Sequence, residues 1–194
     1  MDIDAKTVLY GVIERIGKKH IESEIISSSN VPQIIRDLFS ASIDYLHAYE
    51  YDEEKVHSDL AVALMHYLLS VCLIQSERKV EHDKGLMLDI VIPSARQLRT
   101  DPKRTLLLAF PKKTDPASIN AQIDALRRIQ PNKENIWIVF GHYNDELITP
   151  CKEFSTYVPD NFVKGSLRPF SSIIDDIRLF LEVNKIKSFK IFPV

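Results

Sequence analysis

An acidic residue stands in the middle of an apolar run that is typical of a β-strand. The run reads LMLDIVIP, and its charged member is Asp89. Since strand side chains alternate between the two faces of a sheet, Asp89 is expected to share a face with Met87 and Val91. A carboxylate on a largely buried strand needs a cationic partner or a metal ion. Asp89 is therefore the first candidate for chemistry. The alternatives are a structural salt bridge, for instance with Lys112, and a solvent-facing edge.

Two lysines end the next apolar run. The segment reads RTLLLAFPKK, in which Thr105 to Phe110 is typical of a strand buried on both faces. Lys112 and Lys113 follow it directly. Lysines that end a strand most commonly lie in solvent. A role in chemistry requires one of them to lie beside Asp89, at the mouth of a mixed sheet.

A polar segment between these two runs carries the strongest local concentration of positive charge: Arg96, Arg99, Lys103 and Arg104. Such a patch could bind nucleic-acid phosphates without sequence preference. The alternative is a solvated loop. The net charge of the chain is -2 and its pI is about 6.3, so the composition gives no global basic signal. A nucleic-acid partner would need a local patch of this kind.

Histidines provide further candidates. His142 and Asp145 follow the strand expected at Ile136 to Phe140, at the end where α/β sheets place ligands. An ordinary polar turn is the alternative for this pair. His57 and His66 lie nine residues apart on one expected helix, so they fall on opposite sides of it and do not form a metal pair.

Apolar periodicity and turn residues predict alternating helices and strands after a helical start. The predicted helices are Thr7 to Ile26, Val31 to Tyr49, Asp52 to Gln75, Asp115 to Ile129 and Pro169 to Val183. The predicted strands are Lys79 to Glu81, Leu86 to Ile92, Thr105 to Phe110, Ile136 to Phe140 and Phe189 to Phe192. A turn is expected at 83–85, a polar loop at 94–103, and an irregular segment with one or two short edge strands at 147–164.

Length and composition fit one domain over residues 1–194, with helices in 1–50 and an α/β core in 51–194. The two cysteines, Cys72 and Cys151, form no CxxC site or disulfide framework. The five glycines form no phosphate-cradling loop, which argues against nucleotide-binding fingerprints. No apolar run is long enough for a membrane span and no signal peptide is visible, so a cytoplasmic protein is expected.

The order of the predicted elements resembles the PD-(D/E)XK, or restriction-endonuclease-like, superfamily. A helix at 52–75, a hairpin at 79–92, a third strand at 104–112, and a helix with a fourth strand at 115–140 follow one another as in the core of that superfamily. The resemblance covers roughly the middle half of the chain. It implies an α/β fold with a mixed central sheet flanked by helices, preceded here by an N-terminal helical extension.

The resemblance also implies site residues. In the family an aspartate on the second strand binds a metal ion, and Asp89 matches it. The third strand carries an acidic residue two places before a lysine; here Lys112 or Lys113 supplies the lysine, but the acidic residue is absent. Since Mg²⁺ requires several oxygen ligands, a second carboxylate would be needed, and Glu81 on the neighbouring strand is the first candidate. The lysine would neutralise charge that develops on the phosphate.

These observations lead to a nuclease-like protein that binds DNA or RNA, with Mg²⁺-dependent phosphodiester hydrolysis if the incomplete metal site works. The alternative is a non-catalytic scaffold or oligomerisation protein that keeps the fold. That alternative expects a homodimer, with aromatic residues of the N-terminal helices at its interface: Phe39, Tyr45 and Tyr49. A small-molecule enzyme that uses the region of His142 is a third interpretation.

Overall fold

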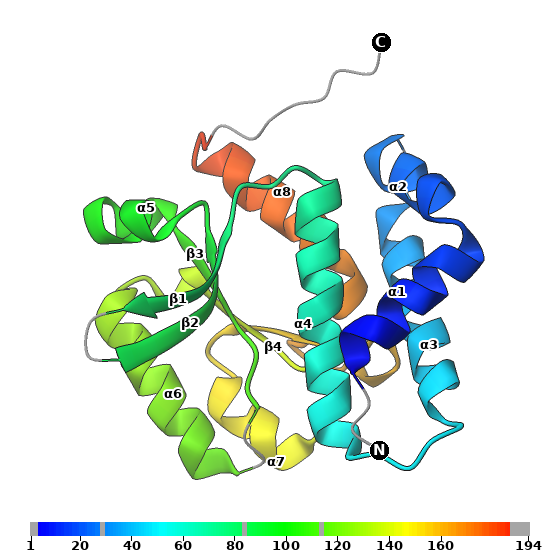
Figure 1. Cartoon of the computed structure of the whole chain (residues 1–194). Helices are drawn as coiled ribbons and strands as arrows, with labels where there is room; N and C mark the ends of the chain where they lie inside the picture. The colour runs from blue at the N-terminus through cyan, green and yellow to red at the C-terminus, as the bar shows by residue number, and fades with distance from the viewer. Residues whose placement is uncertain (1–3, 28–29, 83–84, 113–114, 187–194) are drawn as a thin grey trace.

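The structure is a computed structural model that describes residues 4–27, 30–82, 85–112 and 115–186. Six strands form one mixed sheet in the order β1-β2-β3-β4-β5-β6 (Figure 1). β2 is antiparallel to both of its neighbours, β1 and β3, whereas β3, β4, β5 and β6 run parallel to one another. The strands are β1 (Glu77–His82), β2 (Leu86–Ile92), β3 (Leu106–Ala109), β4 (Ile136–Val139), β5 (Ser155–Val158) and β6 (Arg168–Pro169).

Helices cover both faces of the sheet (Figure 1). The helices are α1 (Ala5–Ile16), α2 (Lys18–Ser27), α3 (Val31–Leu46), α4 (Glu53–Val71), α5 (Ala95–Thr100), α6 (Pro116–Ile129), α7 (Asp145–Ile148) and α8 (Ile173–Val183). Side chains of α1–α4 and α8 share one hydrophobic cluster with one face of the sheet, which we call the α4 face. Side chains of α5, α6 and α7 share a second cluster with the opposite face, the α6 face. No helix in the described ranges is long and apolar enough to span a membrane.

Several elements form where local sequence rules predict them. The side chain of Asp52 accepts a hydrogen bond from the backbone N–H of Lys55 and so caps α4. Asp115 caps α6 in the same way, with Pro116 in the first turn. All residues of β3 and β4 are buried, as expected for strands covered on both faces. The predicted series of helix, hairpin, strand, helix and strand is confirmed.

Other predictions are wrong or need correction. The first helix is two helices, because Gly17, with φ of 110°, ends α1. The segment predicted as a polar loop contains the helix α5, whose first turn is capped by Ser94. β5 is an interior strand between β4 and β6, not an edge strand. The predicted strand at 189–192 and two residues of the predicted turn, 83 and 84, lie outside the described residues.

Side-chain alternation is interrupted where β1 and β2 lie side by side. Leu88 and Val91, three residues apart, both pack on the α6 face, whereas Ile90 packs on the α4 face. The interruption falls beside Lys79, whose φ of 49° lies in the left-handed region that non-glycine residues seldom adopt. The shared face expected for Asp89 and Val91 assumed unbroken alternation, so it stays a prediction.

Candidate functional site

The chain that leaves β3 is held by three successive contacts. The backbone N–H of Phe110 donates a hydrogen bond of 2.9 Å to Asp89 Oδ2. The carbonyl of Pro111 accepts one of 3.3 Å from the hydroxyl of Ser58 in α4. Lys112 Nζ then lies 3.6 Å from Asp59 Oδ1, one residue further along the same helix. These contacts fix Lys112 between β2 and α4.

Asp89 and Lys112 lie close enough for their charges to interact. Burial raises the pKa of Asp89, while the Phe110 N–H and the charge of Lys112 act in the opposite direction. Asp89 and Lys112 are therefore close to each other, as the sequence predicted. The ion pair that Lys112 makes is with Asp59, which the sequence did not point to. Lys113 lies outside the described residues.

The described residues do not fit a magnesium centre. They contain no group of three His, Cys, Asp or Glu side chains arranged to hold a metal ion. Glu81 is exposed on β1 and pairs with Met87, two residues along β2 from Asp89. One oxygen of Asp89 is already bonded to the Phe110 N–H. Because Mg²⁺ binds through several oxygen ligands, we derive no reaction step through a metal here.

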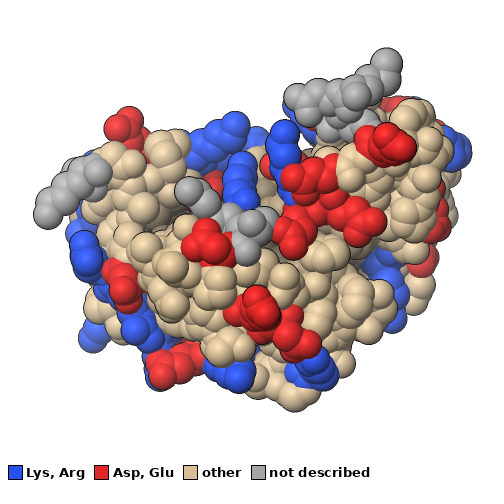
Figure 2. Space-filling model, turned by 90° about the horizontal axis from the view of Figure 1, so that it is seen from below, with Lys and Arg blue, Asp and Glu red and all other residues tan. Residues whose placement is uncertain are grey.

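A groove opens beside this site, between α1, α4 and the start of β1. It encloses about 650 Å³. Its described lining includes five cationic side chains and two carboxylates: Lys6, Lys55, Arg78, Lys79, Lys112, Asp4 and Asp59. Seen from below, Lys and Arg side chains gather in the hollow at the upper edge of the molecule, with acidic side chains on its flank (Figure 2). We call this cavity the basic groove.

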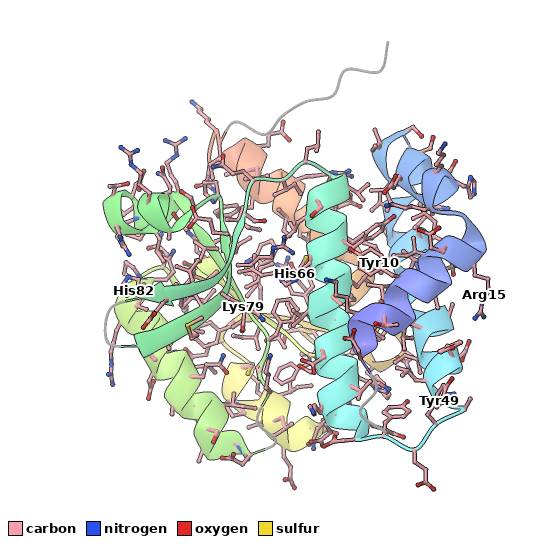
Figure 3. All side chains as sticks on the ribbon, viewed as in Figure 1. Tyr10, Arg15, Tyr49, His66, Lys79 and His82 are labelled. Carbon is pink, nitrogen blue, oxygen red and sulfur yellow. The ribbon has the colours of Figure 1, made fainter. Side chains whose placement is uncertain are left out.

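His66 forms part of the wall of the basic groove. Its Nε2 atom is enclosed and has no hydrogen-bond partner within the described ranges. Burial, followed by the charges of Arg78, Lys79 and Lys6, lowers its pKa from 6.5 to about 4. His66 and Lys79 lie on facing sides of the space between α4 and the hairpin, whereas His82 lies at the far end of the hairpin (Figure 3).

A second cavity, of about 530 Å³, lies where β4 and β5 end. Aromatic and histidine side chains line it, among them Phe39, Phe162, Phe170, His47, His57 and His142. The rings of His57 and His142 are 5.7 Å apart, and His57 Nε2 is 3.1 Å from the hydroxyl of Tyr51. Asp145 takes no part, because it pairs with Lys164 at 2.9 Å and accepts a hydrogen bond from Tyr143. We call this cavity the aromatic pocket.

The structure gives one member of the predicted basic patch, Arg104, a different role from the other three. Arg96 and Arg99 are exposed on α5, which packs on the α6 face through Leu98, across the sheet from Lys112. Lys103 is exposed beyond the end of α5. Arg104 donates hydrogen bonds of 2.9 Å to the carbonyls of Asn184 and Lys185, so it anchors the end of α8. Phosphate binding by the exposed residues Arg96, Arg99 and Lys103 stays a prediction.

Sequence reasoning missed the groove residues Lys6, His66, Arg78 and Lys79. The pair Arg78 and Lys79 at the start of a strand was a visible concentration of positive charge. Regular strand alternation, however, would send the two side chains to opposite faces, so the sequence did not predict that both line one groove. His66 was considered only as a partner of His57. Nothing local in the sequence places α1 across from β1.

The fold is that of restriction endonucleases. The structure superposes on a restriction endonuclease PspGI–substrate DNA complex with a TM-score of 0.65 and 17% identity, over 93% of this chain and 94% of that one. Metal-depleted Ecl18kI in complex with uncleaved, modified DNA gives a TM-score of 0.57 with 11% identity, over 97% of this chain and 82% of that one. A second Ecl18kI complex, with uncleaved DNA, gives 0.53 and 13%.

Sequence comparison adds nothing to this, because no family model and no curated protein matches the chain. The restriction-endonuclease-like fold expected from the order of the elements is confirmed. The superpositions extend over the N-terminal helices as well as the predicted middle half, since they cover more than nine tenths of the chain. At these identities the likeness defines the fold, and the function has to be argued from the site.

Proposed function

We propose that the protein binds duplex DNA in the basic groove, whose lining includes Lys112, the neighbour of Asp89. The observation that carries this proposal is the excess of cationic over acidic side chains in a groove on a fold shared with proteins solved in complex with DNA. Cationic side chains that neutralise phosphates supply most of the sequence-independent affinity for DNA. The chain as a whole has a net charge of -2, so this excess is local.

Both carboxylates of the described groove lining already take part in contacts within the protein. Asp4 accepts hydrogen bonds from the backbone of Lys6 and the hydroxyl of Thr7, and so caps α1. Asp59 pairs with Lys112. Arg78 and Lys79 make no ion pair with any described residue. A polyanion is the ligand that fits this distribution of charge.

Binding is tested by fluorescence anisotropy with a labelled duplex at 50 and 200 mM salt. We expect affinity to fall on the order of 100-fold between these salt concentrations if about four phosphates are contacted. The double variant Arg78→Gln/Lys79→Gln should bind about tenfold more weakly, and Lys112→Gln a few-fold more weakly. Lys133→Gln, in a lysine outside the groove, is the matched control. Equal binding by all four proteins would remove the groove from the proposal.

Hydrolysis is a separate part of the proposal. It requires a second acidic ligand beside Asp89, which the described residues do not supply as they stand; Glu81 is the residue that the sequence predicted for this role. A supercoiled plasmid with Mg²⁺ or Mn²⁺ tests this in wild type, Asp89→Asn and Glu81→Gln. Nicking by wild type that both substitutions abolish assigns a metal-dependent endonuclease. No nicking, or nicking that Asp89→Asn leaves unchanged, restricts the function to binding.

The scaffold alternative predicts a dimer through the N-terminal helices. Tyr45 and Tyr49 are exposed and their rings lie 5.9 Å apart, with Arg15 over the ring of Tyr45. Phe39, in contrast, packs against Phe170 at 5.6 Å and lines the aromatic pocket. Light scattering with Tyr45→Ser/Tyr49→Ser decides: a dimer that the double variant dissociates, without duplex binding by wild type, would favour the scaffold.

A further inference from the structure

One ring nitrogen of His66, in the groove wall, has no hydrogen-bond partner among the described residues. The ring is half-buried on α4, with this nitrogen, Nε2, enclosed. A buried polar atom without a hydrogen bond costs about 1–3 kcal/mol, so native structures rarely keep one without a reason. An apolar side chain, which needs no hydrogen-bond partner, would fill this position at a lower cost in free energy of folding.

The charges around His66 are positive on every side that faces the groove. Lys6 approaches from α1, and Arg78 and Lys79 approach from β1; all three lower the pKa of His66. On α4 itself the nearest groove carboxylate is Asp59, two turns earlier and paired with Lys112. Lys112 is the charged groove residue after β3, and Asp4 caps α1. No available carboxylate among the described groove residues compensates the cations at His66.

The backbone of β1 directs two of these cations to the same side. Arg78 and Lys79 are adjacent in a strand, yet both line the basic groove. Regular alternation would send one of them to the opposite face. The left-handed φ of 49° at Lys79 breaks that alternation, at a cost of about 1–2 kcal/mol. Strain of this kind persists where the surrounding structure or function requires it.

We propose that His66, Arg78 and Lys79 form a phosphate-binding site in the wall of the basic groove, and that a bound phosphodiester draws a proton from solvent onto His66. The proposal rests on DNA binding in the groove and deepens it, because it assigns one phosphate contact and couples it to pH. An anion here offsets the repulsion that the three cations exert on the imidazolium, so protonation of His66 and anion binding support each other.

The coupling predicts tighter binding in acid. If a phosphate raises the pKa of His66 from about 4 in the free protein to about 6, affinity at pH 5 exceeds that at pH 7.5 by about tenfold from this residue alone. Other histidines add their own pH dependence. The measured quantity is therefore the difference between wild type and a variant that cannot titrate at position 66.

The experiment uses two probes on the whole chain. The histidine Cε1–H signals are followed by NMR from pH 4 to 8, with and without 20 mM inorganic phosphate, and duplex affinity is measured over the same range. His66→Gln keeps a polar side chain of similar size but cannot titrate there. His82→Gln is the matched control. His82 lies on β1, like Arg78 and Lys79, but at the far end of the hairpin, away from the groove (Figure 3).

The expected result is that phosphate shifts the titration of His66 upward by one unit or more and leaves His82 unchanged. His66→Gln should lose the about tenfold gain in duplex affinity, whereas His82→Gln keeps it. Duplex binding whose pH dependence is the same in wild type and His66→Gln overturns the proposal but leaves DNA binding intact. Absence of duplex binding at every pH removes the proposed function, and an unmoved His66 signal with phosphate then removes this site as well.

Discussion

Two histidines on one helix differ in their surroundings, and the difference separates two cavities of the molecule. His57 lies in the aromatic pocket and His66 in the basic groove, nine residues apart on opposite sides of α4. Burial lowers the pKa of both. His57, however, has the hydroxyl of Tyr51 as a partner and Glu53 nearby, which acts to raise its pKa. The Nε2 atom of His66 has no hydrogen-bond partner in the part of the chain that the structure describes, and the charges that act on this ring are those of Arg78, Lys79 and Lys6.

The comparison teaches that burial alone does not identify a functional histidine. A buried ring with a hydrogen-bond partner and a compensating carboxylate can remain neutral or charged at modest cost. A ring that lacks both, and that is surrounded by like charge, is poised to respond to an anion. The four predictions below test this contrast, in order of expected effect.

The largest effect is expected from Gly141→Ala, which acts on the aromatic pocket. A Cβ atom at Gly141 would lie 2.0 Å from the carbonyl oxygen of His57, so the end of β4 or the first turns of α4 must move. Because the obstacle is backbone, we expect a loss of about 3 kcal/mol in the free energy of unfolding. Urea denaturation measures it. An unchanged midpoint would show that the close approach does not exist, and Gly11→Ala, where a Cβ meets nothing within 4 Å, is the control.

The second effect separates the two histidines by pH. Since folding lowers the pKa of His66 from 6.5 to about 4, the neutral ring contributes stability above pH 6.5 that is lost as pH falls towards 4. His66→Gln should reduce this acid-induced loss by about 2 kcal/mol. His57→Gln should reduce it less, because Glu53 partly opposes the lowering of the His57 pKa by burial and by the charge of His142. Thermal unfolding at pH 7 and pH 4.5 gives both differences, and a larger change in His57→Gln would reverse the contrast.

The third effect concerns Asp89, the neighbour of the groove residue Lys112. Burial raises the pKa of Asp89 on folding, so the ionised carboxylate lowers the free energy of unfolding at neutral pH. This loss of stability disappears as pH falls through the raised pKa towards 3.8, because the carboxyl group becomes protonated. Asp89→Asn keeps an oxygen that can accept the hydrogen bond from Phe110 and removes the charge. We expect its Tm at pH 7 to rise by about 2–4 °C. A fall in Tm would show that the pairing of the Asp89 charge with Lys112 outweighs its burial.

The smallest effect is on the strand that lines the groove. Lys79→Gly relieves a left-handed backbone conformation and removes one cation. Strain relief is partly offset by the greater freedom of glycine in the unfolded chain, so stability should rise by no more than about 0.5 kcal/mol. Duplex affinity should nevertheless fall a few-fold. Lys79→Gln is the companion variant, since it loses the charge but keeps the strain. If both variants bind duplex as wild type does, Lys79 contacts no phosphate.

Much of the fold followed from local sequence. The apolar run of β3, the interior strand around Trp137, and the Asp115–Pro116 start of α6 each carry their own signal, because burial on both faces and helix capping are properties of short segments. Asp89 was identified for the same reason: a charge inside an apolar strand is anomalous wherever it occurs. The helix α5 was missed because its single buried residue, Leu98, gives no periodic pattern.

The sequence by itself determined the series of helix, hairpin, strand, helix and strand in the middle of the chain, and the location of Asp89 on the strand before the one that ends in lysine. Only the tertiary structure decided that α1 faces β1 across a groove and that Arg78 and Lys79 both line it. It also decided that Lys112 forms an ion pair with Asp59. The physical reason is range: periodicity and caps act within a few residues, whereas a cavity and its charges arise from segments far apart in the chain that packing brings together.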